Sequence, residues 1–263
     1  MRCIMNFNDL DAYLNVRDQD EDRYVYLDEL ISNFVERVPF ENINVQNGWD
    51  IALDNGSMLQ KIINERRGGY CYENNRLFHE YLKSKGFESY LISAKINTPF
   101  GYWSREGSHM SIITVMDGEK FVTDVGFGDL PSKKIPLTKS DSISDVNGIY
   151  KAEYINETDF DVLKYDEFKD EWTILYRAKD IERNLEDFND NIEYNRFNPD
   201  SIFVKRLIIT KVKPYGRVTM SNNHVTITRD GQKSKVKVNG DNYQDLLVEY
   251  FDMRKINIKT FDV

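Results

Sequence analysis

The sequence predicts an α+β protein in which helices come first, a body of β-strands follows, and a smaller mixed unit ends the chain. Apolar residues recur at helical spacing through the first third of the 263 residues, and runs rich in Val, Ile, Thr and Phe follow. Hairpin turns then punctuate residues 206–238, and a short helix is expected at 243–251. We therefore expect three parts: a helical part over 1–86, a β part over 87–190 and an α/β part over 191–263.

Three helical patterns are expected in the first part. The apolar residues of 27–38 recur at helical spacing, and Pro39 ends that run. Ser57 followed by Gln60 resembles a capping box at the start of a second helix. A third pattern runs from about residue 70 to 85 and ends at a glycine.

A β-hairpin is the clearest expectation for the second part. Strand-forming runs occupy residues 90–92, 111–116 and 120–127, and Asp117-Gly118 lies between the last two. An Asp-Gly pair between two such runs is typical of a two-residue hairpin turn. Residues 150–190 are expected to form further strands and loops.

The composition excludes several classes of protein. Two cysteines and three histidines cannot build a disulfide framework or a cysteine-rich zinc module. No apolar run is long enough to span a membrane, and residues 1–20 lack the apolar core of a secretory signal. A net charge of −9 argues against binding to nucleic acid or to an anionic membrane surface. We therefore expect a cytoplasmic protein.

The charge is unevenly spread along the chain. Residues 204–237 hold nine basic side chains and one acidic one, so this segment carries +8 and the remainder −17. Lys233, Lys235 and Lys237 alternate as one solvated face of a strand would, which explains the pattern without a ligand. The alternative interpretation is that the segment attracts an anionic ligand.

Cys71 is the candidate nucleophile. It follows Gly68-Gly69, which allow a tight turn, and it opens the third helical pattern. A cysteine in a first helical turn experiences the positive end of the helix dipole and free N–H groups. Both favour the reactive thiolate, and the N–H groups could hold an oxyanion. A buried, unreactive cysteine is the commoner role for an isolated residue, and we assign that role to Cys3.

A base and an orienting carboxylate for this nucleophile are expected on the hairpin. With a two-residue loop, Ser111 faces Asp124 and His109 faces Gly126. His109 and Asp124 are then diagonal neighbours on one face, with Cβ atoms about 7 Å apart. An Asp in this place would fix the imidazole tautomer and leave the other ring nitrogen for the thiol. A one-residue bulge would put the two side chains on opposite faces.

The other histidines have structural interpretations. His79 lies two helical turns beyond Cys71, about 12 Å along the axis, and cannot touch the thiol. His224 lies beside an expected turn and is assigned to an exposed loop. No group of His, Cys and carboxylate residues has the spacing of metal ligands, so no metal is expected.

At this point the sequence resembles the arylamine N-acetyltransferase family. Residues 67–75, Arg-Gly-Gly-Tyr-Cys-Tyr-Glu-Asn-Asn, resemble its nucleophile motif, and residues 124–128, Asp-Val-Gly-Phe-Gly, resemble the segment with its triad aspartate. Residues 38–42 resemble its Pro-Phe-Glu-Asn element, Ser108-His109 heads a strand, and residues 198–203 resemble a late His-Pro-x-Ser-x-Phe element. The resemblance extends over nearly the whole chain.

The resemblance implies a fold and a reaction. The fold is a helical bundle, an antiparallel β-barrel-like domain and an α/β lid, on a papain- and transglutaminase-like core with the triad Cys71, His109 and Asp124. The reaction is ping-pong: acetyl-CoA acetylates the cysteine, CoA leaves, and an aromatic amine or hydrazine takes the acetyl group. A thiolate suits this exchange, because one sulfur leaving group replaces another of similar basicity.

The resemblance also implies ligand contacts. Phe40, Phe127 and Phe203 would line the acceptor pocket, and Gly126 and Gly128 would let the backbone approach the CoA pyrophosphate. The phosphates of CoA would also give the basic segment a ligand, with Lys233 and Lys235 as candidate contacts. Glu73 is more easily explained as a carboxylate that stabilises a helix start than as a catalytic group.

Two departures from the family pattern concern local packing and acceptor preference. Asn198 stands where the family often has histidine, and Ser108 where Thr is frequent. Three other functions remain open: a cysteine hydrolase or transglutaminase-like acyl transferase, a silent binding module, and a related amide synthase. The basic segment favours the CoA enzyme over the hydrolase, because a peptide amide carries no polyphosphate.

Overall fold

The computed structural model describes residues 6–17, 22–98, 101–138 and 141–261, and Cys3 lies outside these ranges. Within them the helices are α1 (Phe7–Leu14), α2 (Arg23–Arg37), α3 (Ile43–Asn47), α4 (Asn55–Glu65), α5 (Cys71–Ser84), α6 (Asn189–Phe197), α7 (Ile202–Lys205) and α8 (Tyr243–Phe251), with 3-10 turns η1 (Leu185–Phe188) and η2 (Lys259–Phe261). The strands are β1 (Phe40–Glu41), β2 (Glu88–Ile96), β3 (His109–Met116), β4 (Glu119–Val122), β5 (Ile135–Pro136), β6 (Ser142–Asp145), β7 (Gly148–Tyr154), β8 (Asp159–Asp166), β9 (Glu171–Lys179), β10 (Ile209–Lys213), β11 (Gly216–Met220), β12 (His224–Arg229) and β13 (Gln232–Lys237).

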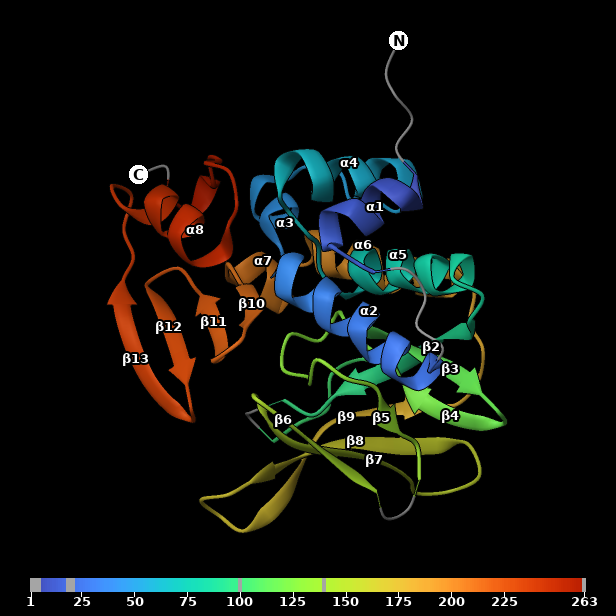
Figure 1. Cartoon of the computed structure of the whole chain (residues 1–263). Helices are drawn as coiled ribbons and strands as arrows, with labels where there is room; N and C mark the ends of the chain where they lie inside the picture. Colours follow the sequence, from blue (N-terminus) through green and yellow to red (C-terminus); the bar gives the residue numbers. More distant parts are fainter. Residues whose placement is uncertain (1–5, 18–21, 99–100, 139–140, 262–263) are drawn as a thin grey trace.

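Two antiparallel sheets organise these strands, and helices cover them (Figure 1). The larger sheet has the strand order β5-β4-β3-β2-β9-β8-β7-β6, and the smaller has the order β1-β10-β11-β12-β13. The larger sheet curls until its ends approach each other, since Leu137, just after β5, bridges Ala152 of β7. The α+β fold with a nearly closed, barrel-like sheet is therefore present.

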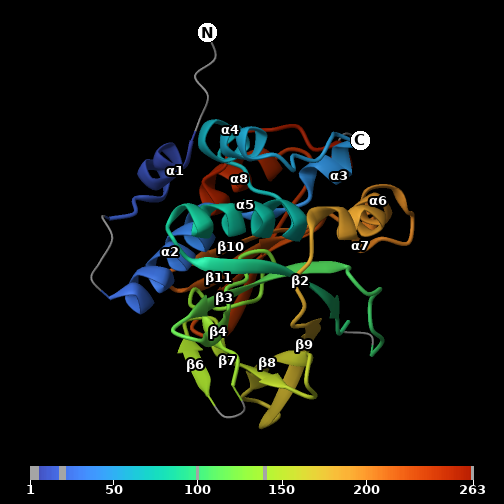
Figure 2. The same cartoon turned by 90° about the vertical axis from the view of Figure 1, so that its right-hand side faces the viewer.

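Helix α5 lies across β2 and β3, so the helix that begins at Cys71 rests on the sheet that contains His109 (Figure 2). Phe78 and Leu82 of α5 are fully buried, together with Ile112 of β3. Burial of a Phe or Leu side chain contributes about 1.5–3 kcal/mol, so this contact holds helix and sheet firmly together.

The apolar residues of the described ranges form separate buried clusters. One lies among the N-terminal helices and includes Cys71 and Phe203, one fills the barrel-like sheet, and one lies between β10–β13 and α8. No helix among the described residues has both the length and the apolar character needed to cross a bilayer.

The structure corrects two local expectations. The second helix begins at Asn55, and Asp54 caps it by accepting a hydrogen bond from the Ser57 N–H at 2.8 Å, so Ser57 is not the cap. The strand expected over 120–127 ends at Val122.

Two elements cross the expected division of the chain. Strand β1 comes from the helical part but pairs with β10 of the smaller sheet, Phe40 opposite Thr210. The expected boundary at residue 190 falls within α6, which begins at Asn189.

Candidate active site

Cys71 is the first residue of α5 and is 2% exposed. Gly68 and Gly69 precede it, and neither has a positive φ, so backbone conformation does not explain the two glycines. Lack of space does. A β-carbon on Gly68 would lie 1.8 Å from the Pro39 carbonyl oxygen, and one on Gly69 would lie 2.5 Å from Glu73. Positions 68 and 69 therefore have no room for a side chain.

The hairpin that contains His109 has the expected register. Met116 pairs with Glu119 and Ile113 with Val122, and the Thr123 N–H still donates to the Ile112 carbonyl. Beyond this point the ladder stops, so His109 does not pair with Gly126.

Side chains replace the strand ladder after Thr123. The Val125 N–H donates to Asn75 Oδ1 at 2.9 Å, and the Gly126 N–H donates to Asp124 Oδ1 at 2.8 Å. Asn75 also donates to Asp124 Oδ1 at 2.8 Å and to the Met110 carbonyl at 2.6 Å. Asn75 thus joins α5 to β3 and to the segment after β4, one helical turn after the cysteine.

His109 and Asp124 meet directly despite the shorter strand. His109 Nε2 lies 2.5 Å from Asp124 Oδ2, and both residues are nearly inaccessible to solvent. This contact leaves Nδ1 for the thiol of Cys71, which lies close enough to act on the pKa of the imidazole.

Electrostatic interactions favour the charged forms of both His109 and Asp124. Burial opposes charge on the imidazole, but the Asp124 carboxylate and the Cys71 sulfur outweigh it and raise the pKa of His109 to about 10. Burial likewise opposes charge on Asp124, but the imidazolium and the hydrogen bonds from Asn75 and Gly126 hold its pKa below the usual value. An imidazolium at neutral pH stabilises an adjacent thiolate.

Tyr176 of β9 is part of this site and was not expected from the sequence. Its buried hydroxyl donates to Asp124 Oδ2 at 3.1 Å and lies 3.1 Å from Ser111 Oγ. Its ring packs against His109 at 5.0 Å between centroids. The sequence predicts strands within residues 150–190, but only the tertiary structure shows that the Tyr176 side chain reaches the hairpin.

The aromatic residues singled out for the acceptor pocket fall into two groups. Phe127 packs edge-on against His109, with ring centroids 5.3 Å apart. Phe40 and Phe203 contact each other at 6.1 Å, and Phe203 also contacts Tyr70, the residue before Cys71, at 5.5 Å. The two groups lie beside the histidine and beside the cysteine segment, respectively.

The two glycines assigned to the CoA pyrophosphate have structural reasons of their own. A β-carbon on Gly126 would lie 2.8 Å from Cys71 Cα, so glycine allows the loop to approach the nucleophile. Gly128 has φ +84° and lies against Thr210 and Phe40. Both positions bring the loop after β4 close to the cysteine and to β10.

The basic segment is less positive than its composition indicates. Four of its nine cations form ion pairs: Lys205 with Asp200, Lys211 and Lys213 with Asp252, and Arg217 with Asp129. Lys233 and Lys235 lie exposed on β13, at the outer edge of the smaller sheet (Figure 1). The structure does not bring these two lysines into contact with the cysteine.

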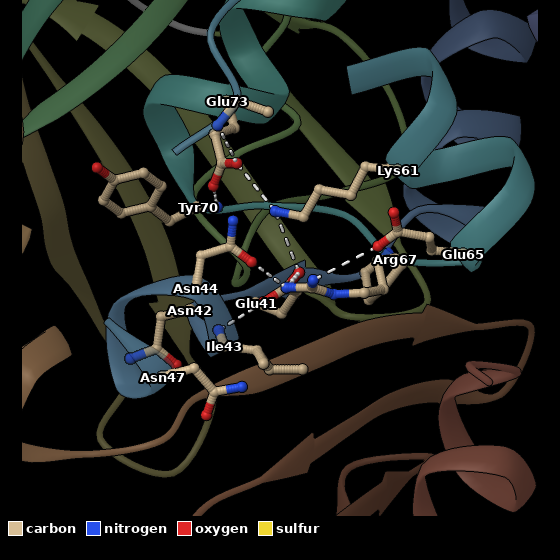
Figure 3. Close-up of polar contacts among 12 residues, drawn as sticks. Glu41, Asn42, Ile43, Asn44, Asn47, Lys61, Glu65, Arg67, Tyr70 and Glu73 are labelled. Atoms are coloured by element: carbon tan, nitrogen blue, oxygen red, sulfur yellow. Dashed lines mark hydrogen bonds and ion pairs between the residues drawn. The ribbon is translucent and has the colours of Figure 1, made fainter. Parts of the chain in front are cut away.

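A buried ion cluster lies behind the cysteine segment (Figure 3). Lys61 Nζ is 2.9 Å from Glu73 and 3.4 Å from Glu41, and Arg67 donates to Glu41 at 2.7 Å. Burial opposes charge on Glu41, but Arg67 and Lys61 outweigh it and lower its pKa. Burial and Glu41 instead raise the pKa of Glu73.

Glu73 belongs to the start of the helix. Its carboxylate accepts hydrogen bonds from the backbone N–H groups of Tyr70 and Ala52, both at 3.3 Å. A carboxylate in this place stabilises a helix N-terminus. The remaining histidines do not approach Cys71: His79 bonds to Ser89 at 2.9 Å, and His224 opens β12. Among the described residues, no group of three or more His, Cys, Asp and Glu side chains could hold a metal ion.

Comparison with known proteins gives one consistent family. A family model described as N-acetyltransferase matches residues 25–260. The arylamine N-acetyltransferase of Escherichia coli K12 is 30% identical over 198 residues, which are 74% of this chain and 69% of that protein.

Solved structures of this family share the fold. Arylamine N-acetyltransferase C of Bacillus anthracis superposes with a TM-score of 0.85 at 25% identity, covering 95% of this chain and 99% of that one. The Mycobacterium marinum arylamine N-acetyltransferase, solved in complex with CoA, gives a TM-score of 0.85 at 21% identity, covering 94% and 93%. With its buried cysteine, histidine and aspartate placed together, the chain belongs to the arylamine N-acetyltransferase family.

Proposed function

We propose that this enzyme transfers an acetyl group from acetyl-CoA to an arylamine or arylhydrazine, through a ping-pong reaction with an acetyl-Cys71 intermediate. The observation that carries the proposal is the buried placement of His109, 2.5 Å from Asp124, beside the loop that approaches the backbone of Cys71. A nucleophile, a base and an orienting carboxylate in this order are the components of a catalytic triad.

The first half-reaction is acylation of the cysteine. The Cys71 thiolate attacks the thioester carbonyl of acetyl-CoA, the carbon–sulfur bond to CoA breaks, and the departing CoA thiolate takes a proton from the His109 imidazolium. Because Cys71 is the first residue of α5, backbone N–H groups at the start of the helix would stabilise the developing oxyanion.

The second half-reaction returns the enzyme to its starting state. The amine nitrogen attacks the acetyl-Cys71 carbonyl, neutral His109 accepts the proton that the nitrogen loses, and the cysteine leaves as a thiolate. Asp124 keeps its negative charge and holds the imidazole in place throughout.

The ligand contacts form a finer part of this proposal. The ring of Phe127 beside His109, and the pair Phe40 and Phe203 beside the cysteine segment, would hold a flat aromatic acceptor. Exposed Lys233 and Lys235 would attract the phosphates of CoA before it binds. The division of the chain into three parts, with its second boundary moved to just before α6, and a cytoplasmic location are further proposals.

The alternatives receive less support. A hydrolase or transglutaminase-like enzyme could use the same three residues, but the family relatives act as N-acetyltransferases by name. A silent binding module has no need of an ordered and buried Cys71, His109 and Asp124. An amide synthase would share the triad and differ in its acyl donor.

Intact-protein mass spectrometry tests donor and nucleophile together. After mixing with acetyl-CoA in the absence of an amine, we expect a gain of one acetyl group, lost on addition of an arylamine. Cys71→Ala should gain no acetyl group, and Cys3→Ser should still gain one. Absence of a mass gain in the unaltered protein, or acetylation of Cys71→Ala, would refute the mechanism.

A further inference from the structure

The loop that follows β4 brings Asp124 to the active site, and its far end is held by Arg217 of β11. Arg217 Nη1 donates to the Gly128 carbonyl at 3.0 Å and forms an ion pair with the Asp129 carboxylate. A single guanidinium therefore holds both the backbone and a side chain of the loop. Its planar group has several fixed donors, which suits this double contact.

The same carboxylate also receives two contacts from the barrel-like sheet. Lys164 of β8 donates to Asp129 Oδ1 at 2.8 Å, and the Tyr150 hydroxyl of β7 lies 3.4 Å from the same oxygen. Arg217 and Lys164 approach from different sheets, and their side chains are 18% and 24% exposed. Asp129 is thus a point at which the smaller sheet, the loop and the barrel are fastened together.

The ion pairs of Asp129 with Arg217 and Lys164 persist over a wide range of pH. Burial opposes charge on Asp129, but Arg217 and Lys164 outweigh it and lower the pKa of this carboxyl to about 2. Arg217 stays charged at every accessible pH. The contacts therefore do not titrate together with His109.

The held segment is short, and three of its six residues contact the reacting groups. Within residues 124–129, Asp124 binds His109, a β-carbon on Gly126 would touch the Cys71 backbone, and the ring of Phe127 packs on His109. Gly128, whose carbonyl oxygen Arg217 holds, is thus only four residues after the orienting aspartate. Displacement by about 1 Å can lower a catalytic rate by two orders of magnitude.

We propose that Arg217 is a positioning residue for acyl transfer, which holds residues 124–129 so that Asp124 and Phe127 keep the His109 imidazole aimed at Cys71. Arg217 itself need not touch either substrate. The role in acyl transfer rests on the proposed function. The reactivity of the Cys71 thiol, however, can be measured in the free enzyme without either substrate.

Another role for Arg217 would give a different kinetic result. Lys164 lies close enough to Lys233 to be affected by its charge, so several cations gather near Gly128. If Arg217 instead contacted the phosphates of CoA, its removal would raise the KM for acetyl-CoA and leave the free cysteine unchanged. A positioning role predicts the reverse, with a loss of kcat and of thiol reactivity at nearly constant KM.

The experiment measures iodoacetamide alkylation of Cys71 and steady-state acetyl transfer, with Cys3→Ser in every protein so that one thiol reacts. We expect Arg217→Met to lower the alkylation rate constant and kcat about tenfold, with the KM for acetyl-CoA changed less than about twofold. Arg217→Lys, which keeps the charge but not the planar double contact, should recover part of both rates. Arg229→Met is the matched control, because Arg229 lies on the neighbouring strand and packs on Tyr215 outside the loop.

Each result decides the inference. Alkylation of Arg217→Met at the rate of the unaltered protein would overturn it, and a rise in KM alone would assign Arg217 to phosphate binding. If Arg217→Met does not fold, Arg217→Lys decides: alkylation about threefold slower supports the inference, and an unchanged rate overturns it. Failure of the protein to acetylate any amine would overturn the proposed function, whereas the alkylation comparison would still decide the role of Arg217.

Discussion

Replacing Asp124 by asparagine removes the negative charge beside His109 and keeps the shape of the side chain. In the structure the pKa of His109 is about 10, against an ordinary value of 6.5. That difference corresponds to about 5 kcal/mol in favour of the imidazolium, at 1.36 kcal/mol for each pKa unit. Burial opposes this charge and only the Cys71 sulfur would still favour it, so without the carboxylate the pKa should fall toward 6.5.

The expected loss of cysteine reactivity follows from this value. At pH 7 nearly all His109 is protonated in the unaltered protein, whereas only about a quarter is protonated once the pKa reaches 6.5. Iodoacetamide alkylation of Cys71 at pH 7 should therefore slow by up to about fourfold, the factor by which the imidazolium decreases. Asp161→Asn is a suitable control, since Asp161 is also buried and paired, with Arg177 in the barrel.

The pH dependence of stability provides a second readout of the same change. A raised pKa makes His109 contribute fully below about pH 6.5, and this contribution is lost as the pH rises through about 10. A lowered pKa makes Asp124 contribute above about pH 4. In urea unfolding, the stability difference between the unaltered protein and Asp124→Asn should be largest at about pH 4–6.5 and shrink toward pH 10. An unchanged alkylation rate together with a pH-independent difference would refute the ionised pair.

Three further changes test other parts of the site. Tyr176→Phe removes a buried hydroxyl from the aspartate and should cost about 1–3 kcal/mol of stability and slow alkylation severalfold, measured by urea unfolding and iodoacetamide; no change in either would exclude the hydroxyl from the site. Gly126→Ala forces a methyl group against the nucleophile's backbone and should cost about 1–3 kcal/mol and most of kcat, whereas Gly56→Ala, inside a helix with ordinary space, should be neutral or stabilising. Equal behaviour of the two alanine variants would contradict the close approach. Charge reversal of both Lys233 and Lys235 to Glu should raise the KM for acetyl-CoA more than that for the amine; equal KM values would return β13 to a solvated face.

Local signals in the sequence predicted the framework of the site well. The Asp117-Gly118 turn determines the register of the hairpin, because both residues take positive φ values there. Helix α5 starts at Cys71 as expected, since the apolar periodicity and the glycines before it are local features. Features that are determined by residues close together in the sequence are therefore predicted correctly.

The errors have a common physical cause in tertiary contacts. The strand after the turn stops at Val122 because the side chains of Asn75 and Asp124, rather than β3, take the next backbone donors. Gly68 and Gly69 looked like turn glycines, but crowding by Pro39 and Glu73 explains them. Such reasons cannot be found in a pattern of nearby residues.

The partners of the basic segment illustrate the same limit. Its +8 charge counted Lys211 and Arg217 as free cations, but each binds a carboxylate from another part of the chain. Counting charge along the sequence therefore overstated the attraction available to a ligand. Only exposed cations such as Lys233 keep that role.

The pairing of β1 constrains when this enzyme can become active during its synthesis. Phe40 bridges Gly69, beside the nucleophile, and pairs with Thr210, which is 170 positions later in the chain. A ribosome that adds 5–20 residues per second needs roughly 10–30 seconds to cover that distance. Until then β1 has no strand on its outer side, and Asn42, which binds the carbonyls of Phe203 and Arg206, has no partners there. We therefore expect nascent chains that end before β10 to remain unreactive toward acetyl-CoA, so that acylation begins only on a nearly complete protein.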